Sequence, residues 1–244
     1  MVPGVFLLEV KSPGIANEVH PGQFVMVGCD SSYGRLLRRP ISVHKTQQDI
    51  VSLLFAVLGM GTEWLSKRLP GEKVDVLGPG GNGFSVNARS RNMLMVAGGM
   101  GIAPLCFLAS EAVKRGFFPR LLVGAVTSCQ ICPDTLIPPG TEIIKCTEDG
   151  SAGLKGLVTD LLPENIAWAD QVFACGPFPM YRAVQEKYQS LIQNKQFQVS
   201  LEVRMGCGLG FCYACTIKTR QGLKQVCKDG PVFELQDILW NEEI

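Results

Sequence analysis

Four cysteines near the end of the chain constrain its fold and chemistry more than any other feature. They are Cys207, Cys212, Cys215 and Cys227, so their spacing is C-x4-C-x2-C-x11-C. A compact loop that supplies three thiolates, with a fourth from a later element, is the ligand order of a plant-type [2Fe–2S] cluster. Glycines alternate with other residues through this loop, and their lack of a Cβ lets backbone N–H groups approach the sulfurs. The spacing therefore predicts an iron–sulfur site.

Other uses of the cysteines fit less well. Zinc sites favour paired C-x2-C knuckles, and only Cys212 and Cys215 have that spacing. Two disulfides are typical of a small secreted domain, whereas the first residues, Met1 to Gly4, lack the basic region and apolar run of a signal peptide. Elsewhere, Cys129 and Cys132 form a lone C-x-x-C pair. A thioredoxin-like role is one interpretation of that pair, but an ordinary reduced loop is the commoner one.

The 244 residues are enough for two domains, or for two domains and a small module. A net charge of +1 gives no electrostatic reason to expect binding to nucleic acid or to an anionic membrane. The uncharged run from Met93 to Ser110 is interrupted by glycines and by Pro104. We therefore expect a buried strand, a turn and a helix start there, and no membrane span. A cytoplasmic protein is the resulting expectation.

The first part of the chain has the pattern of a small antiparallel barrel. Short β-type runs alternate with turns such as Pro13-Gly14, Pro21-Gly22 and Pro70-Gly71. The predicted strands are Val5–Val10, Gln23–Val27, Arg39–His44, Ile50–Leu58 and Lys73–Leu77, with one short helix at Glu63–Leu69.

Two motifs in this barrel favour a phosphate-containing ligand. Arg39 and Ser42 lie on one predicted strand, where a guanidinium can bind a pyrophosphate and a hydroxyl can bind a flavin ring nitrogen. After the next strand, Gly59-Met60-Gly61-Thr62 opens the short helix, and glycines followed by an N-capping threonine form an anion site. Each motif alone is common on protein surfaces, but their order strengthens the prediction.

From Asn92 onward the pattern changes to alternating strands and helices, which implies a parallel sheet with ligands at the carboxyl ends of its strands. The turn Gly98-Gly99-Met100-Gly101 follows the first strand, but Pro104 stands where the dinucleotide fingerprint has its third glycine. The predicted strands are Met93–Ala97, Leu121–Val126, Glu142–Cys146, Gln171–Ala174 and Gln198–Val203, with helices ending near Arg115 and spanning Met180 to about Gln193.

Four segments, taken in order, resemble the ferredoxin–NADP reductase superfamily: Arg39–Ser42, Gly98–Pro104, Cys175–Pro177 and the four late cysteines. More narrowly, Glu202–Cys215 and Val226–Phe233 resemble the electron-transfer subunits of type B dihydroorotate dehydrogenases, and the resemblance covers essentially the whole chain. It implies an antiparallel FAD-binding β-barrel at residues 1–88. A parallel-sheet nicotinamide-binding α/β domain would follow at 89–203, and a small C-terminal [2Fe–2S] module at 204–244.

The resemblance also implies which residues bind each cofactor. The residues expected to hold FAD are Arg39, Pro40, Ile41, Ser42, Leu54, Phe55, Ala56, Gly61 and Thr62. Those expected to contact NAD are Gly99, Gly101, Cys175, Gly176 and Pro177, with Cys175 near the reacting carbon. Many superfamily members stack a tyrosine on the flavin where Ile41 stands, so any stacking here would come from Tyr33 or Phe55.

Electron counting connects the three cofactors. A nicotinamide exchanges two electrons as hydride, a [2Fe–2S] cluster passes one, and a flavin does both, so FAD must lie between them. In the family, electrons pass from dihydroorotate to the FMN of a catalytic partner subunit, then through the cluster and FAD to NAD+. The resemblance implies a heterotetramer of two copies of each chain, and no acid or base on this chain.

Two alternatives stay open. A related reductase subunit would serve a hydrogenase, a sulfide dehydrogenase or a ferredoxin-linked transhydrogenase. A small electron carrier or regulatory cluster protein with a degenerate nucleotide domain is the alternative that is not an enzyme.

The sequence predicts NAD rather than NADP. A 2′-phosphate usually needs an arginine or lysine near the end of the second strand of the sheet. That strand leads here into Thr127-Ser128-Cys129-Gln130, which contains no cation.

Overall fold

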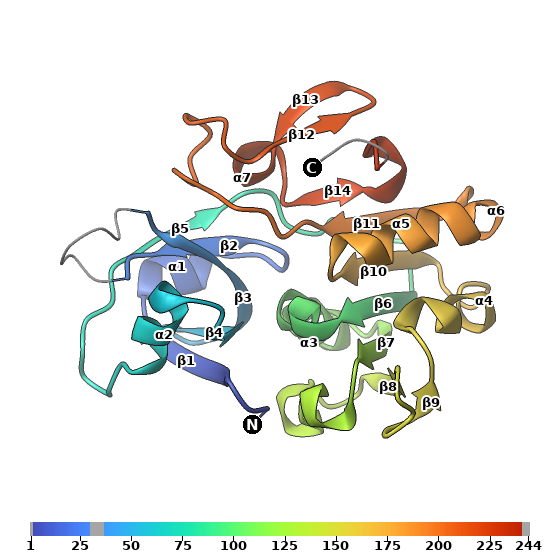
Figure 1. Cartoon of the computed structure of the whole chain (residues 1–244), viewed down its shortest axis with the longest axis horizontal. Helices are drawn as coiled ribbons and strands as arrows, with labels where there is room; N and C mark the ends of the chain where they lie inside the picture. The colour runs from blue at the N-terminus through green and yellow to red at the C-terminus, as the bar shows by residue number, and fades with distance from the viewer. Residues whose placement is uncertain (1, 30–36, 241–244) are drawn as a thin grey trace.

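The structure is a computed structural model that describes residues 2–29 and 37–240. It contains a five-stranded antiparallel sheet, a seven-stranded sheet flanked by helices, and a small C-terminal hairpin above both (Figure 1). This arrangement confirms the predicted fold class.

The five-stranded sheet has the order β1-β4-β3-β2-β5, and all of its ladders are antiparallel. No ladder joins β1 to β5 in the described residues, so this sheet is an open barrel. Its core contains Val25, Val43 and Leu53, which are completely buried. The strands are β1 (Val5–Lys11), β2 (Phe24–Val27), β3 (Arg39–Gln47), β4 (Ile50–Ala56) and β5 (Val76–Gly80).

Three details of the barrel differ from the sequence prediction. Pro13 begins helix α1 (Pro13–Glu18) rather than a turn, because the fixed φ of proline suits the first helical position. Helix α2 (Met60–Ser66) begins three residues before the predicted Glu63, since Gly59 is its N-cap. Strand β5 begins at Val76, three residues after the predicted Lys73.

The second sheet has the order β14-β11-β10-β6-β7-β8-β9, and its ladders are parallel except that β14 pairs antiparallel with β11. The predicted parallel sheet is therefore confirmed, with one antiparallel edge strand that the sequence analysis did not predict. The strands are β6 (Asn92–Gly98), β7 (Phe118–Ala125), β8 (Glu142–Thr147), β9 (Leu154–Lys155), β10 (Gln171–Cys175), β11 (Gln196–Ser200) and β14 (Val232–Glu234).

Helices cover both faces of this sheet. On β6, Met93 and Met95 pack on the side of α3 (Ile102–Lys114), whereas Leu94 and Val96 pack on the side of α5 (Phe178–Lys187). All four side chains are completely buried, as expected for a central strand with two covered faces. Two short helices complete this part, α4 (Leu162–Asn165) and α6 (Gln189–Ile192).

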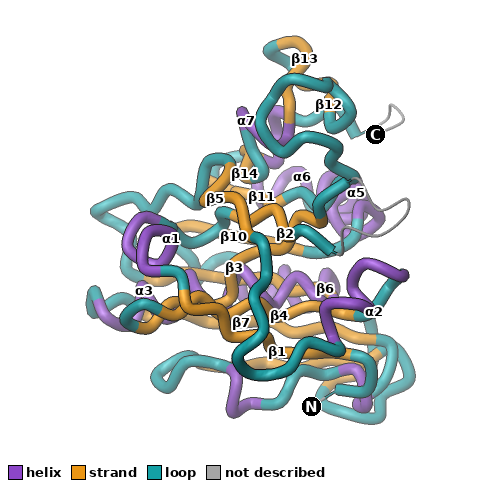
Figure 2. Tube along the Cα trace, turned by 90° about the vertical axis from the view of Figure 1, so that its left-hand side faces the viewer, coloured by secondary structure: helices purple, strands orange, loops and turns teal. Residues whose placement is uncertain are grey.

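The C-terminal part follows β11 as an exposed loop, a hairpin of β12 (Thr216–Thr219) and β13 (Gly222–Gln225), helix α7 (Val226–Asp229) and then β14. Asn82 joins it to the barrel, since its backbone N–H donates to the Gly230 carbonyl at 2.6 Å. Trp240 joins it to helix α5, since the centroids of the Trp240 and Tyr181 rings lie 5.2 Å apart. Figure 2 shows the hairpin and α7 above both sheets.

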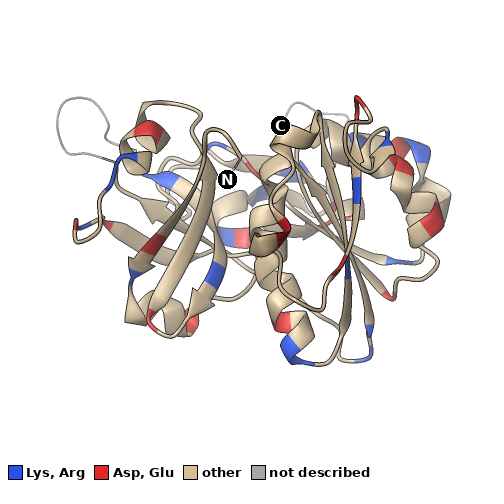
Figure 3. Ribbon diagram, turned by 90° about the horizontal axis from the view of Figure 1, so that it is seen from below, with Lys and Arg blue, Asp and Glu red and all other residues tan. Residues whose placement is uncertain are grey.

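Among the described residues, no helix is long and apolar enough to cross a bilayer. The segment around Met93 to Ser110 forms β6, a short 3-10 turn and α3, as the sequence predicted. Basic and acidic residues are interspersed over the face seen in Figure 3.

Candidate functional site

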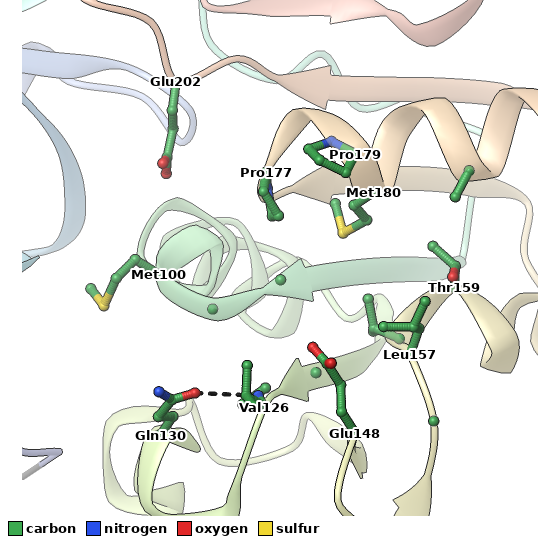
Figure 4. Close-up of a pocket in the computed structure, with 17 residues that line it drawn as sticks. Met100, Val126, Gln130, Glu148, Leu157, Thr159, Pro177, Pro179, Met180 and Glu202 are labelled. Atoms are coloured by element: carbon green, nitrogen blue, oxygen red, sulfur yellow. Dashed lines mark hydrogen bonds between the residues drawn. The ribbon is translucent and has the colours of Figure 1, made fainter.

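The larger of two neighbouring cavities, about 500 Å³, lies at the carboxyl ends of the parallel strands. Figure 4 shows Glu148, Thr159, Met180 and Glu202 around it. Ligands of open α/β sheets bind at this edge. The cavity is lined by Gly98, Gly99, Met100, Gly124, Ala125, Val126, Gln130, Glu148, Gly156, Leu157, Val158, Thr159, Pro177, Pro179, Met180, Ala183 and Glu202.

Glycines allow the strand ends beneath this cavity to pack closely. A Cβ on Gly101 would lie 1.9 Å from the carbonyl oxygen of Cys175, and one on Gly176 would lie 2.7 Å from Cε of Met180. Of the predicted nicotinamide residues, Gly99 and Pro177 line the cavity. Gly101, Cys175 and Gly176 are not among its lining residues and form packed backbone next to it.

The smaller cavity, about 190 Å³, lies between the barrel and the second sheet. Seven predicted flavin residues line it: Pro40, Ile41, Ser42, Leu54, Phe55, Ala56 and Thr62. Other lining residues include Phe24, Met100, Glu202 and Met205. The structure therefore brings most of the predicted flavin residues together around one space.

The two remaining flavin candidates, Arg39 and Gly61, do not line this cavity but contact each other beside it. A Cβ on Gly61 would lie 2.5 Å from Nε of Arg39, so the guanidinium rests against the first turn of α2. Arg39 also donates a hydrogen bond to the carbonyl of Leu37. A cation next to a helix start beside the cavity fits a pyrophosphate.

Thr62 is not the N-cap of α2 as predicted, because it occupies the third helical position and Gly59 is the N-cap. Its hydroxyl instead accepts hydrogen bonds from the N–H groups of Leu58 (2.9 Å) and Gly59 (3.2 Å). Thr62 therefore holds the turn that leads into the helix.

Phe55, one of the two aromatic residues expected to stack on the flavin, already packs against another ring. The ring of Phe55 lies 6.1 Å from that of Phe6, nearly parallel to it at 24°. Tyr33, the other candidate, lies outside the described residues.

Glu202 and Met100 line both cavities and so mark where they meet. The sequence analysis did not predict either residue as part of a site. The signal for Glu202 was its place near the carboxyl end of the predicted strand Gln198–Val203, at the edge where ligands bind. Desolvation raises the pKa of the Glu202 carboxyl, although the side chain is exposed toward the cavities.

Cys175 and Tyr181 are buried next to the point where the two cavities meet, and their contacts hold the backbone there. The Cys175 thiol lies 3.7 Å from a carboxylate oxygen of Glu202, and burial raises the pKa of Cys175 well above its ordinary value. The Tyr181 hydroxyl accepts from the N–H of Gly176 at 2.9 Å and donates to the carbonyl of Ser200 at 2.7 Å. This pair of bonds joins the ends of β10 and β11.

Cys207, Cys212 and Cys215 lie on the loop before β12 and Cys227 lies in α7, and backbone N–H groups donate to the sulfurs of all four. Cys207 Sγ accepts from the N–H groups of Leu209 and Phe211, both at 3.3 Å, and Cys227 Sγ accepts from that of Gly210 at 3.2 Å. The bond from Leu209 is the largest cause that lowers the pKa of Cys207, to about 6. Such bonds stabilise thiolates, which are the form that binds iron.

The sulfurs are grouped as two pairs. The N–H of Cys207 donates to Cys212 Sγ, and the N–H of Cys227 donates to Cys215 Sγ, each at 3.4 Å. Burial, with Cys215 as the neighbouring thiol, raises the pKa of Cys227 to about 12. In the described residues, no three His, Cys, Asp or Glu side chains surround one metal position. Two pairs of thiolates fit two irons that each take two protein ligands.

The cluster loop lies close to the smaller cavity. A Cβ on Gly208 would lie 2.5 Å from Cγ of Met26, so the loop packs directly on β2. Met205, two residues before Cys207, lines the cavity. On the outer side, Leu209, Phe211 and Tyr213 expose 53%, 78% and 69% of their surfaces.

An open antiparallel barrel, a parallel sheet with cavities at its carboxyl edge, and a four-cysteine loop together define an iron–sulfur flavoprotein of the ferredoxin–NADP reductase fold. Comparison with solved structures supports this class. A chain of the NADH-dependent reduced ferredoxin–NADP oxidoreductase, solved in a study of flavin-based electron bifurcation, is 30% identical with a TM-score of 0.87. The match covers 98% of this chain and 87% of that one. The ferredoxin reductase of carbazole 1,9a-dioxygenase matches at 18% identity, with a TM-score of 0.62, over 79% of this chain and 61% of that one, which shows the fold alone.

Residues 202–239 match the iron–sulfur cluster binding domain of dihydroorotate dehydrogenase B. The dihydroorotate dehydrogenase B (NAD(+)) electron transfer subunit of Geobacillus sp. is 39% identical over 90% of this chain and 86% of its own length. The electron transfer subunit of Desulforamulus reducens is 35% identical over 98% of this chain and 94% of its own length. The chain therefore belongs to the family of dihydroorotate dehydrogenase B electron transfer subunits.

Proposed function

We propose that this chain passes electrons from the FMN of a dihydroorotate dehydrogenase catalytic subunit, through a [2Fe–2S] cluster and FAD, to NAD+ in pyrimidine biosynthesis. The observation that carries the proposal is the order of the three sites. The cluster loop packs beside the smaller cavity, and that cavity meets the larger one at Met100 and Glu202.

This order matches the electron count of the three cofactors. FAD supplies the conversion between one-electron and two-electron transfer, so its place is the middle site. Met205 reaches the middle cavity from the cluster side, and Glu202 and Met100 border it on the nicotinamide side. The chain's own residues position the cofactors and exclude water, and none of them needs to act as an acid or a base.

The residues proposed for each cofactor follow from their places in the structure. Arg39 and Gly61 would hold the FAD pyrophosphate at the start of α2, and Ser42 would face the flavin. The residues proposed to complete the FAD site are Pro40, Ile41, Leu54, Phe55, Ala56 and Thr62. NAD would lie along Gly99 and Pro177, with Gly101, Cys175 and Gly176 shaping the backbone beneath it. Cys207, Cys212, Cys215 and Cys227 are the proposed iron ligands.

An electron transfer subunit implies a catalytic partner, and the exposed side chains around the cluster suggest where it binds. Leu209, Phe211 and Tyr213 are large exposed side chains on the cluster loop itself. An FMN-containing subunit that docks there would leave a short path between the FMN and the cluster. A heterotetramer of two copies of each chain, located in the cytoplasm, completes the proposal.

Replacing Arg39 tests the flavin site. Arg39→Ala is expected to weaken FAD binding by about 10- to 100-fold, because a charge-assisted hydrogen bond to phosphate is lost. The measurement is the FAD dissociation constant of the reconstituted apoprotein. Arg38→Ala is the matched control, since Arg38 pairs with Asp75 at 2.5 Å instead of facing α2. Equal losses in both variants would remove Arg39 from the FAD site.

The isolated chain itself tests the whole function. It is expected to pass electrons from NADH to ferricyanide and to be inert toward dihydroorotate. Oxidation of dihydroorotate requires a base and a second flavin facing a pocket for an anionic pyrimidine, and the proposed FAD, NAD and cluster sites already occupy this fold. Addition of an FMN-containing catalytic subunit should restore NAD+-dependent oxidation. Bleaching of the FAD in the single subunit by dihydroorotate would contradict the proposal.

A second candidate is a ferredoxin-linked transhydrogenase subunit, because the oxidoreductase chain described above is 30% identical. Hydrogenase and sulfide dehydrogenase complexes are further alternatives of the same kind. The test is the binding partner: if the purified chain binds no FMN-containing dihydroorotate dehydrogenase subunit but accepts electrons from reduced ferredoxin in a complex, the second candidate is favoured.

A further inference from the structure

We propose that Glu148 selects NAD over its 2′-phosphorylated form, by accepting a hydrogen bond from the 2′-hydroxyl of the adenosine ribose. The inference rests on the proposed function, in which the larger cavity binds NAD. It assigns the nucleotide specificity of that cavity to one side chain.

The position of Glu148 follows from the strand order. Glu202 comes shortly after β11 and Glu148 directly after β8, and these strands lie four places apart in the order β11-β10-β6-β7-β8. With a spacing of about 4.8 Å between neighbouring strands, the two strands lie roughly 19 Å apart. The end of the larger cavity that Glu202 lines adjoins the smaller cavity, which is the proposed flavin site. The nicotinamide must lie at this end to exchange hydride with the flavin. The adenosine half then extends toward β7 and β8, where Glu148 stands.

Backbone bonds fix Glu148 at this end of the cavity. Its N–H donates to the carbonyl of Ala125 at 3.1 Å, and the next N–H, of Asp149, donates to that of Val126 at 3.3 Å. Ala125 is the last residue of β7 and Val126 follows it, and both line the same cavity. Figure 4 shows the Glu148 carboxylate directed into the cavity from the β8 side.

The Glu148 carboxylate is available to a ligand. In the part of the chain that the structure describes, it has no hydrogen-bond or ion-pair partner, and it lines the cavity. Its neighbour Asp149 is already used within the loop, since it accepts from the N–H (2.9 Å) and the hydroxyl (2.6 Å) of Ser151. The two acids therefore differ in what they can bind.

The charges around the cavity favour a hydroxyl over a phosphate. The described lining residues include two carboxylates, Glu148 and Glu202, and no lysine or arginine. The nearby Lys155 packs its methylene groups against Gly150 and is not a lining residue. A ribose hydroxyl can donate to a carboxylate, whereas a 2′-phosphate brings acceptors and negative charge only. Specificity of this kind combines an attraction to one ligand with a repulsion of the other.

The test uses adenosine fragments, because they reach neither the flavin nor the nicotinamide end. Dissociation constants of 5′-AMP and of 2′-phospho-5′-AMP are measured by calorimetry for the full chain, for Glu148→Gln and for Asp149→Asn. The preference is the ratio of the dissociation constant of 2′-phospho-5′-AMP to that of 5′-AMP. Glu148→Gln is expected to lower this ratio by about tenfold or more, because it weakens the hydrogen bond to the 2′-hydroxyl and removes the repulsion of the 2′-phosphate. Asp149→Asn should keep the preference within about twofold, because its carboxylate serves Ser151.

The ratio of kcat/KM for NADH and NADPH, with ferricyanide as acceptor, should change in the same direction. An unchanged ratio in Glu148→Gln, with NADH still active, would overturn the role of Glu148 and leave the proposed function intact. An equal change in Asp149→Asn would also overturn it, because any nearby charge would then suffice. If the unmodified chain bound neither 5′-AMP nor NADH, the proposed function itself would fail.

Discussion

Cys227→Ser, purified anaerobically, is expected to lose the brown chromophore with most of its iron and acid-labile sulfide. A serine oxygen is a harder ligand than a thiolate and binds these irons less well. The Cys227 sulfur also accepts a hydrogen bond from the N–H of Gly210 at 3.2 Å, and the N–H of Cys227 donates to the Cys215 sulfur. Cys227 therefore contacts the cluster loop through both its sulfur and its backbone. The measurements are iron and sulfide content and the visible absorption spectrum.

FAD content separates loss of the cluster from loss of the fold. The proposed flavin residues lie on β3, β4 and α2, and Cys227 is not among the residues that line their cavity, so this variant should retain FAD and NADH–ferricyanide activity. Cys129→Ser is the matched control, because Cys129 is an exposed cysteine outside the loop. A Cys227→Ser protein with full iron and sulfide would remove Cys227 from the ligand set.

Gly101→Ala is expected to destabilise the protein by about 3 kcal/mol or more, which is unusually large for one methyl group. The added Cβ would lie 1.9 Å from the carbonyl oxygen and 2.2 Å from the carbonyl carbon of Cys175. Both partners are backbone atoms, so the ends of β6 and β10 would have to move apart. The measurement is the thermal midpoint, which should fall by at least about 6 °C.

Gly99→Ala is the control for this prediction. Gly99 has a φ of +54°, which costs an alanine about 1–2 kcal/mol, but no atom lies within 4 Å of its Cβ position. Gly101→Ala should therefore be the less stable variant. Equal instability of the two variants would contradict the prediction, because Gly101 has an ordinary φ of −58° and only its packing against Cys175 resists an added Cβ.

Much of the fold could be predicted because its signals are local. The central strand, β6, is an uncharged apolar run followed by glycines, and the structure places it between two layers of helices. Strand β14 was missed because it has only three residues, and its pairing depends on β11, which lies more than thirty positions earlier in the chain. Short strands stabilised by distant partners carry little pattern of their own.

In the candidate site, too, the features with a local sequence signal were predicted and those that depend on distant contacts were not. The cysteine spacing and the segment Arg39–Ser42 were visible because their chemistry lies in adjacent residues. The predicted N-cap position of Thr62 was wrong, because the helix begins earlier than predicted and the Thr62 hydroxyl accepts from the N–H groups of the turn before it. Met100 and Glu202 were missed because their importance comes from two cavities meeting, which only the packed structure reveals.

The pairing of β11 with β14 has a consequence for how the chain is built. Ser200 and Val232 face each other across this ladder, and the N–H of Leu201 donates to the carbonyl of Pro231 at 2.9 Å. The whole segment that carries the iron ligands leaves and returns at neighbouring points of one sheet edge. In topological terms it is a single long hairpin loop, and such insertions can be exchanged without rebuilding the scaffold beneath them. A tight turn in its place would still connect the two strands, but it would also remove Glu202, Met205 and Pro231 from the lining of the smaller cavity, so the exchangeable part begins beyond these residues.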